Sequence, residues 1–171
     1  MKNVKNNEII PINNGFEPVF DQNSKVLILG SFPSVISRKN QFYYGNLRNH
    51  FWDMLSTFYN VSIGSDNQSK IEFLLKYNIA LWDVASTCQI SGSSDNNINS
   101  KNIQPVDLFS VLNNAPKIKY ILINGKKAYN LFTKFFPTCP IIPICMPSTS
   151  PANVSYNEQV WVDALNKINL Q

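Results

Sequence analysis

The side chains of this sequence that could do chemistry gather in four segments. The first covers residues 30–52; it begins with Gly-Ser-Phe-Pro and is unusually dense in aromatic and amide side chains over residues 41–52. The others begin at Asp83, Asn124 and Met146, and the last continues as Pro-Ser-Thr-Ser-Pro-Ala-Asn. Together they offer an aromatic face, amide and carboxylate groups, and a proline-rich loop. That combination suits a protein that grips a planar heterocycle attached to a phosphate backbone.

Each segment also has a purely structural interpretation. The aromatic side chains that could simply pack in a core are Tyr43, Tyr44, Phe51 and Trp52. Asp83 could cap a turn, and Asn124 with Gly125 could mark the start of a helix. The chemical interpretation therefore depends on whether the fold brings the four segments together.

The elements that would position these segments are visible as apolar runs. Nearly continuous runs, typical of strands buried on both faces, occupy residues 25–31, 79–82, 118–124 and 141–146. Helical patterns lie between them, which predicts a mainly parallel sheet covered on both sides. The predicted fold class is α/β, with three α/β/α layers. Because such sheets bind ligands at the carboxyl ends of their strands, the four segments are expected to meet at that edge.

Helices are predicted from apolar stripes at helical spacing. The stripes lie within residues 51–59, 71–75, 128–135 and 160–168. Ser155 and Glu158 predict a capping box before the last helix, and Pro105 predicts the first turn of a helix over residues 106–112. Residues 86–102 are rich in Ser and Asn without an apolar period, so a long functional or mobile loop is predicted there.

Composition narrows the class of protein. The formal net charge of +4 and the pI near 8.9 permit a polyanionic partner. The three cysteines have no paired spacing and His50 is the single histidine, so a Cys/His metal site is not expected. The odd cysteine count and the lack of a long apolar run predict a reduced, cytoplasmic protein without a membrane segment. The length predicts one domain over residues 1–171, on which residues 1–24 pack as an extension. A monomer is expected by default.

Five blocks of the sequence are similar to a known family. They are residues 30–33, 43–52 (Tyr-Tyr-Gly-Asn-Leu-Arg-Asn-His-Phe-Trp), 82–84 (Trp-Asp-Val), 92–95 (Gly-Ser-Ser-Asp) and 147–153. In this order, from about residue 25 to the C-terminus, the chain resembles the hypoxanthine-DNA glycosylase branch of the uracil-DNA glycosylase superfamily. The second block and the last are the most specific.

The resemblance implies a four-stranded sheet with flanking helices and an enzyme that uses no cofactor and no metal. Such enzymes hydrolyse the N-glycosidic bond of a flipped-out deaminated base, hypoxanthine or uracil, in double-stranded DNA; single-stranded DNA stays open as a substrate. The catalytic role falls on Asn49. Base contacts are expected from Phe32, Asp83 and Tyr44, the last as the ring on which the base stacks. DNA contacts are expected from Ser31, Pro33, Ser148, Ser150, Pro151 and Asn153.

Three positions depart from the general pattern of the superfamily. Phe32 stands where an activating Asp or Asn is usual, so that role moves to Asn49. Met146 replaces the His or Asn that usually begins the second motif, which weakens the case for efficient uracil removal, although the branch itself is normally apolar there. Leu47 stands where proline is expected.

Asn49 and Asp83 have different chemical capacities. Hypoxanthine and uracil share a carbonyl oxygen beside a ring N–H. Asn49 offers a donor and an acceptor, so it could match this edge or hold the attacking water, but it cannot be a general base near neutral pH. An ionised Asp83 only accepts, which favours a ring N–H over the bare nitrogen of adenine. Base recognition is the favoured role for Asp83, and general base catalysis is the alternative.

Two other functions are alternatives. A non-catalytic nucleic-acid-binding module would keep the aromatic platform but would not need Asn49. If the protein is an enzyme, Asn49→Ala should abolish excision and leave DNA binding largely intact. This result would exclude the binding module. A thiol enzyme using Cys88 and His50 fits the fold only loosely, because neither residue stands in a recognisable nucleophile motif.

Overall fold

The central sheet has four parallel strands at the places where the apolar runs predict them. The computed structural model describes residues 11–12, 15–90 and 98–169. Its central strands are β2 (Val26–Gly30), β3 (Ile79–Asp83), β6 (Tyr120–Asn124) and β7 (Pro143–Met146). Their order in the sheet is β3-β2-β6-β7, and each pairing is parallel. The prediction of a parallel sheet is confirmed.

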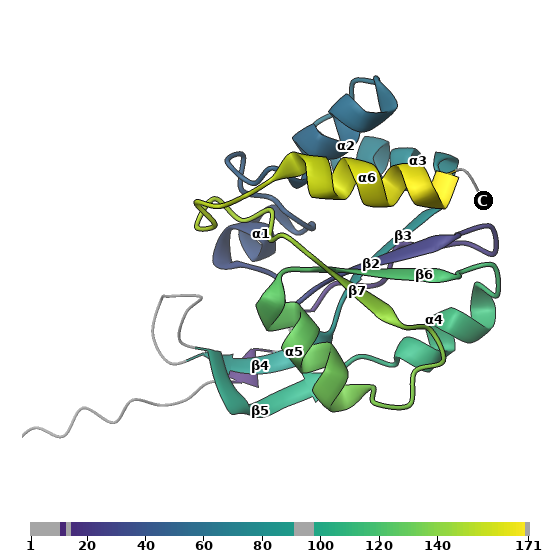
Figure 1. The fold of residues 1–171 in the computed structure, drawn as a ribbon. Coiled ribbons are helices and arrows are strands. Elements are labelled where there is room, and N and C mark those ends of the chain that lie inside the picture. The colour runs from purple at the N-terminus through teal and green to yellow at the C-terminus, as the bar shows by residue number, and fades with distance from the viewer. Residues whose placement is uncertain (1–10, 13–14, 91–97, 170–171) are drawn as a thin grey trace, which may run out of the picture.

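Helices cover both faces of this sheet. The helices on one face are α2 (Phe51–Tyr59), α3 (Asn67–Lys76) and α6 (Glu158–Asn169), and those on the other are α4 (Leu108–Asn114) and α5 (Lys126–Phe135) (Figure 1). Alternate residues of β2 supply both interfaces, since Val26 and Ile28 belong to the first cluster and Leu27 and Leu29 to the second. This explains why the strand is apolar at successive positions rather than at every second one. The three-layer α/β/α prediction is confirmed.

The prediction of a long loop over residues 86–102 is wrong for residues 86–90 and 98–102, the part of that range that the structure describes. A hairpin of β4 (Ala85–Ile90) and β5 (Ile98–Pro105) forms there, and β1 (Pro11–Ile12) completes a second, antiparallel sheet in the order β1-β4-β5. Backbone hydrogen bonds make this ladder, and its register is shifted at two points, so an alternating apolar pattern need not mark it. The predicted motif at residues 92–95 lies outside the described residues.

Two predicted helix starts are also wrong. Pro105 ends β5, and α4 begins at Leu108, where the Asp107 side chain accepts a hydrogen bond from the Ser110 amide at 3.1 Å. At α6 the cap lies two residues after Ser155. Asn157 Oδ1 accepts from the Gln159 amide at 3.0 Å, and Glu158 is the first helical residue. The first error comes from placing Pro105 in a first helical turn when it ends a strand. The second comes from choosing one of several closely spaced capping side chains.

A short helix that the sequence analysis did not predict lies beside the carboxyl end of β2. Helix α1 (Val35–Asn40) begins at Ser34, whose hydroxyl accepts from the Ser37 amide at 3.1 Å. It ends at Gln41, which has a φ of 54°. With only six residues and a single apolar turn, α1 is too short to show a periodic stripe.

The segment before β2 packs along the edge of the sheet. Val19 and Leu81 of β3 exchange both backbone hydrogen bonds, at 2.9 and 2.8 Å. The Trp82 indole donates to the Phe16 carbonyl at 2.8 Å. These hydrogen bonds attach residues 16–19 to β3. Within the described part of the chain, no helix is long and apolar enough to cross a membrane.

Candidate active site

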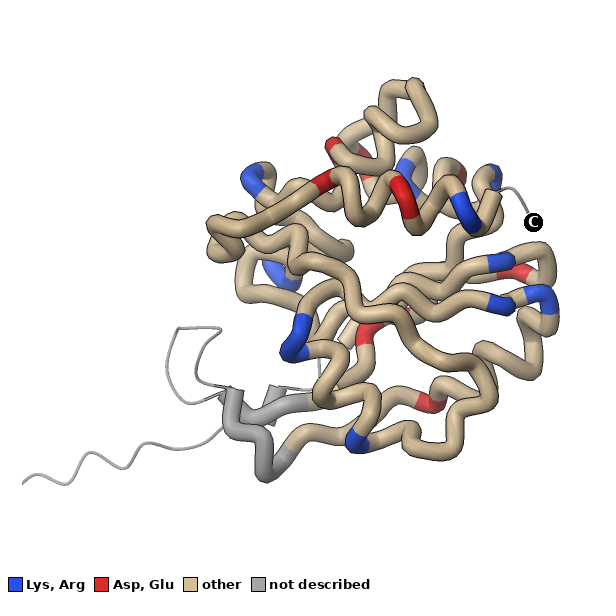
Figure 2. The backbone as a smooth tube through the Cα atoms, in the orientation of Figure 1, with Lys and Arg blue, Asp and Glu red and all other residues tan. Residues whose placement is uncertain are grey.

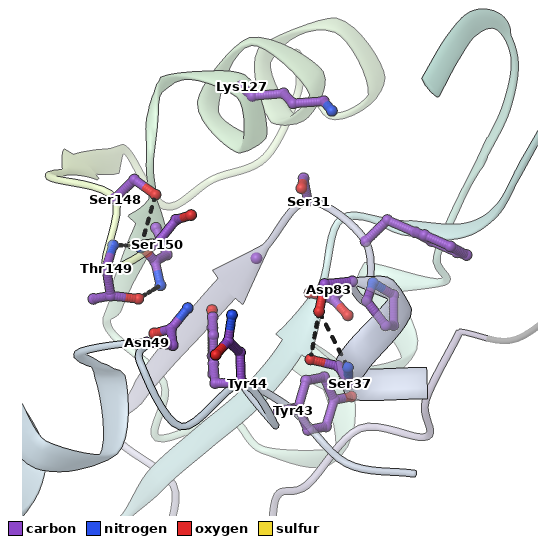
Figure 3. A pocket seen from close by; sticks show the side chains of 16 residues that line it. Ser31, Ser37, Tyr43, Tyr44, Asn49, Asp83, Lys127, Ser148, Thr149 and Ser150 are labelled. Atoms are coloured by element: carbon purple, nitrogen blue, oxygen red, sulfur yellow. Dashed lines mark hydrogen bonds between the residues drawn. The ribbon is translucent and has the colours of Figure 1, made fainter. Parts of the chain in front are cut away.

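A pocket of about 180 Å³ opens where the four parallel strands end (Figure 3). Its walls come from the segments that follow β2, β3, β6 and β7. Pockets for drug-sized ligands usually measure roughly 300–1,000 Å³, so this one suits a smaller molecule such as a single heterocycle. The fold has therefore brought all four chemical segments of the sequence to one place.

Most of the predicted site residues line this pocket. They are Ser31, Phe32, Pro33, Tyr44, Asn49, Asp83, Ser148 and Ser150. Pro151 and Asn153 are not among the lining residues. The Asn153 amide instead braces its own loop, since Nδ2 donates to the Ser148 carbonyl at 2.9 Å and Oδ1 accepts from the Ser155 amide at 3.2 Å.

The sequence analysis missed several polar residues of the pocket. They are Ser34, Ser37, Asn46, Lys127 and Thr149, and it noted Asn124 only as the end of a strand. Ser37 belongs to the unpredicted helix α1, and Ser34 caps the start of that helix. The other three stood within or next to quoted segments, so their position beside a strand end was the signal that could have found them.

Asp83 lies deep in the pocket and is only 5% exposed. A Cβ added at Gly30 would collide with Asp83 Oδ1, so a glycine is required at the end of β2 for the carboxyl group to lie there. Asp83 Oδ2 is buried without a hydrogen-bond partner among the described residues. Burial raises the pKa of Asp83 to about 7 because it disfavours the charged form.

The Tyr44 hydroxyl lies close to the same point. It would be 3.1 Å from that added Cβ of Gly30, and it too is buried with no hydrogen-bond partner in the described part of the chain. Burial, and secondarily the charge of Asp83, raise the pKa of this phenol, and the nearby Asn124 side chain offsets part of that rise. We call the Asp83 carboxyl and the Tyr44 hydroxyl the floor of the pocket.

The backbone of Tyr44 has an unusual conformation. Its φ is 51°, which is costly for a bulky residue and is typical of functional sites. One face of the ring stacks on Phe51, with centroids 4.0 Å apart and planes 25° apart. Phe51 is fully buried and does not line the pocket, so it supports the Tyr44 ring from behind.

Asn49 is half-buried and precedes helix α2. Its Oδ1 accepts from the Phe51 amide at 3.0 Å, which fixes the orientation of the side-chain amide. The Asn49 Nδ2 has no hydrogen-bond partner within the described residues. A carbonyl oxygen can accept two hydrogen bonds, so the side chain keeps one acceptor site and its two donors.

The loop after β7 is rigid. Asn124 and Thr149 are bonded reciprocally, because Asn124 Nδ2 donates to Thr149 Oγ1 and the Thr149 amide donates to Asn124 Oδ1, both at 2.9 Å. The Trp161 indole of α6 donates to the Pro147 carbonyl at 2.8 Å. The His50 amide donates to the Thr149 carbonyl at 3.0 Å, which joins this loop to the segment that carries Asn49.

Half-buried polar side chains surround the opening of the pocket. We call Asn49, Ser148 and Ser150 the mouth, and all three line the pocket (Figure 3). Lys127, at the start of α5, also borders it, while Asp83 is the one acidic residue among the lining residues. The basic residues in Figure 2 include positions on the loop before α2 and at the start of α5. These two segments also contribute Asn49 and Lys127 to the pocket lining. This setting tolerates a polyanion.

The pocket residues do not suggest other chemistry. Within the described residues no group of three or more His, Cys, Asp or Glu could hold a metal ion. His50 is exposed and its ring stacks on Tyr156, with centroids 4.5 Å apart and planes 3° apart. The Cys88 side chain, its partner in the thiol hypothesis, lies outside the described residues.

Comparisons with known proteins point to one family. The model of the uracil DNA glycosylase superfamily matches residues 17–168. A hypoxanthine DNA glycosylase of Methanosarcina barkeri is 39% identical over 116 residues, which cover 67% of this chain and 72% of that protein. A hypoxanthine DNA glycosylase of Methanosarcina acetivorans is 37% identical over 122 residues, covering 68% and 73%.

A solved structure has the same fold. It is the solution NMR structure of a Methanosarcina acetivorans protein that was proposed to be a uracil DNA glycosylase. The TM-score is 0.79 and the sequence identity 30%, and the match covers 94% of this chain and 99% of the other.

Proposed function

The chain belongs to the uracil DNA glycosylase superfamily, and we propose that its pocket recognises hypoxanthine at the floor and hydrolyses the glycosidic bond at the mouth. The chain is a DNA glycosylase for deaminated bases, in keeping with the family and the hypoxanthine DNA glycosylases that it matches. The observation that carries the finer proposal is the convergence of Asn49, Tyr44 and Asp83 in one pocket of base size.

Depth in the pocket separates the roles of Asp83 and Asn49. A flipped base enters with its sugar still attached to the DNA backbone, so the sugar stays at the mouth. The edge that deamination alters lies farthest from the glycosidic nitrogen and therefore reaches deepest. Asp83, at 5% exposure, would then meet this edge, whereas the half-buried Asn49 would be nearer to the sugar. This supports recognition rather than general base catalysis for Asp83.

The neutral form of Asp83 suits a deaminated base. A protonated carboxyl group has one donor and one acceptor, which complement the carbonyl oxygen and ring N–H of hypoxanthine. An ionised carboxylate would accept from the N–H but repel the carbonyl oxygen. Because burial raises the pKa of Asp83 to about 7, the neutral form is well populated near neutral pH. The Tyr44 hydroxyl supplies a second polar group beside it.

Tyr44 also provides the stacking surface. Phe51 occupies one face of its ring, and the ring lines the pocket, so a planar base can stack on the side away from Phe51. The support from Phe51 and the hydrogen bonds of the Asn49 segment keep this platform fixed. A fixed platform lowers the conformational entropy lost on binding.

Asn49 would hold the attacking water. The base leaves with the electron pair of the glycosidic bond, and positive charge develops at the sugar C1′ atom, as in glycoside hydrolysis generally. The remaining acceptor site of Asn49 Oδ1 can take a hydrogen bond from the water, whose oxygen then attacks C1′. The DNA phosphates and fixed dipoles stabilise the developing charge. The water loses a proton as its oxygen bonds to C1′, and the departed base takes up a proton. The products are therefore the neutral free base and an abasic sugar.

The mouth would bind the DNA backbone. Ser148 and Ser150 have hydroxyl groups at the opening, on a loop that Asn124 and Trp161 hold in place. Ser31 and Pro33, which follow β2, line the same pocket. Contacts of this kind position a duplex without recognising its sequence. We propose duplex DNA as the main substrate, a monomer as the active form and the cytoplasm as the location.

The proposal is tested by incubating the protein, without metal or cofactor, with end-labelled duplexes that contain one deoxyinosine, one deoxyuridine or one G·T mispair. Alkali then cleaves the abasic sites. We expect cleavage at deoxyinosine, and a loss of about 100-fold or more in Asn49→Ala, because one fixed polar group at a reacting centre contributes about that much. Asn113→Ala, at an exposed position of α4, is the control and should match the wild type.

Two results would contradict the proposal. Intact strands in every lane, with the protein bound to DNA, would indicate a non-catalytic binding module on the same scaffold. Cleavage at deoxyuridine alone would retain the glycosylase and refute hypoxanthine as its base.

A further inference from the structure

Three neighbouring strands place their last residues in one row along the pocket. The strands are β3, β2 and β6, which lie side by side in the sheet (Figure 1). Asp83 of β3 pairs in register with Gly30 of β2. On the other side of Gly30, Asn124 of β6 is at the same level, because the preceding residues of β2 and β6 are paired. Side chains at one level of a parallel sheet point to the same face, so Asp83 and Asn124 flank Gly30. All three residues line the pocket.

The absence of a side chain at Gly30 leaves space for polar groups from both sides. A Cβ there would collide with Asp83 Oδ1 and would be 3.1 Å from the Tyr44 hydroxyl. The Asn124 amide is near the same hydroxyl, where it opposes the rise in the pKa of that phenol. The polar groups across the row are therefore, in order, a carboxyl group, a hydroxyl group and an amide.

Asn124 keeps one hydrogen-bond donor for a ligand. Its Oδ1 accepts from the Thr149 amide and its Nδ2 donates to Thr149 Oγ1, both at 2.9 Å. An amide nitrogen carries two hydrogens, so one remains after these bonds. The hydrogen bonds of the described residues include none from this second hydrogen. Because both bonds to Thr149 fix the amide plane, the remaining donor is held in place beside the floor.

Hypoxanthine has three groups in the matching order. Its ring N1–H, the carbonyl oxygen on C6 and the bare ring nitrogen N7 follow one another along the rim of the purine. A carboxyl group can pair with N1–H, a hydroxyl group can donate to the carbonyl oxygen, and an amide can donate to N7. Uracil has an N–H and a carbonyl oxygen in the same order, but a C–H group stands where the purine has N7.

We propose that Asn124 donates its remaining hydrogen to N7 of the flipped purine, and that this contact makes the pocket prefer hypoxanthine to uracil. The inference rests on the proposed function and adds to it the residue that distinguishes a purine from a pyrimidine. With uracil in the pocket the Asn124 donor faces a C–H group and stays unpaired, which weakens binding. Guanine has the same three groups as hypoxanthine, so its protection comes from its normal base pair, which makes flipping more costly.

A purely structural role for Asn124 is the alternative. Asn124 joins β6 to the loop after β7 through Thr149, so loss of its amide would loosen that loop whatever base is bound. Thr149→Val separates the two roles. It removes the oxygen that accepts from Asn124 Nδ2, but the Thr149 backbone amide still donates to Asn124 Oδ1 and the donor toward the base remains.

The test measures the binding of three duplexes by fluorescence anisotropy. At one position they carry deoxyinosine, 7-deazadeoxyinosine or 3-deazadeoxyinosine, and every protein carries Asn49→Ala to slow excision during the measurement. With Asn124 intact, we expect the 7-deaza duplex to bind about tenfold more weakly than the deoxyinosine duplex, because a C–H group replaces N7 and leaves a pocket donor unpaired. The 3-deaza duplex should bind like deoxyinosine.

The variants then assign the contact. Asn124→Ala should bind the deoxyinosine and 7-deaza duplexes equally. Thr149→Val should weaken all three duplexes alike and keep the tenfold difference. Asn124→Asp covers the case in which the alanine variant does not fold, since its carboxylate can accept from both the amide and the hydroxyl of Thr149 while it removes the donor. It should also lose the preference for deoxyinosine.

Several results would overturn the inference. Equal binding of the deoxyinosine and 7-deaza duplexes with Asn124 intact would show that the pocket makes no contact with N7. A tenfold difference that survives in Asn124→Ala would leave Asn124 with a structural role alone. Weak binding of the 3-deaza duplex, and not of the 7-deaza duplex, would place the contact at N3. In each case excision at deoxyinosine by the wild type would leave the proposed function standing, whereas intact deoxyinosine strands would refute that function itself.

Discussion

The floor and the mouth of the pocket use similar polar groups but satisfy them very differently. At the floor, Asp83 Oδ2 and the Tyr44 hydroxyl are buried without partners among the described residues. At the mouth, the loop that carries Ser148 and Ser150 is held by the reciprocal pair of Asn124 and Thr149. Proteins rarely leave buried polar atoms unpaired, because each costs about 1–3 kcal/mol. The unpaired atoms at the floor therefore lower the free energy of unfolding, whereas the paired Asn124 and Thr149 side chains beside the mouth do not.

This difference suggests that the two regions of the pocket have different roles in binding and reaction. In the proposed function, a mouth whose loop is held by hydrogen bonds keeps the DNA backbone and the sugar in place for the reaction. A floor with unpaired atoms has strong interactions left to make, and only a base of the right shape and polarity can make them. Substitutions at the two regions should therefore have opposite effects on stability.

The largest expected effect concerns Asp83. Its pKa is raised from 3.8 to about 7 in the folded protein, so the folded state holds the proton more tightly than the unfolded state between these values. The free energy of unfolding should then fall by about 2.5 kcal/mol as the pH rises from 5 to 8. Asp83→Asn should remove this decrease, as measured by urea unfolding at both pH values. Asp163→Asn, at an exposed position, is the control. If the decrease with pH persists in Asp83→Asn, titration of Asp83 is not its cause.

The next effect concerns Thr149. Thr149→Val keeps the shape but removes the oxygen that accepts from Asn124 Nδ2, which leaves a half-buried donor unpaired. We expect a loss of about 2 kcal/mol in the free energy of unfolding, measured in urea, and slower excision. Thr149→Ser retains the hydroxyl and should be close to wild type. If the valine and serine variants are equally stable, the mouth does not depend on this hydrogen bond.

The smallest expected effect is an increase in the free energy of unfolding. Tyr44→Phe removes a buried hydroxyl that has no partner, so the protein should gain up to about 1 kcal/mol while excision slows. Tyr43→Phe is the matched contrast, because the Tyr43 hydroxyl donates to the Glu17 carbonyl at 2.9 Å and its removal should destabilise the protein by a similar amount. Thermal unfolding of the two variants gives the comparison directly. Destabilisation in both would mean that the floor is no different from an ordinary core.

Most of the central fold could be predicted from the sequence because its strands are buried on both faces. Continuous apolar runs such as residues 25–31 have no other simple explanation in a chain of this composition. The β4–β5 hairpin could not be predicted, since its residues show no apolar alternation and its register is interrupted. Helix α1 escaped notice because it is only six residues long.

The site could be predicted in outline but not in its hydrogen bonds. Asn49, Tyr44 and Asp83 followed from strand ends and from the family resemblance, and the structure brings them together. Asn124 and Thr149 are 25 positions apart, and nothing in their local sequence indicates that they pair. Burial of Asp83, which favours its neutral form, is likewise a property of the folded chain and not of the segment.

The central claim is that the floor recognises the base while the mouth carries out the reaction. The most direct test is the rate of deoxyinosine excision from pH 5 to 9, at enzyme concentrations below saturation, for the wild type and for Asp83→Asn. If neutral Asp83 recognises the base, the wild-type rate falls as the pH rises through about 7, and Asp83→Asn remains active with a flatter profile. If instead the rate rises through about 7 and Asp83→Asn abolishes excision, Asp83 is the general base and the division between floor and mouth is wrong.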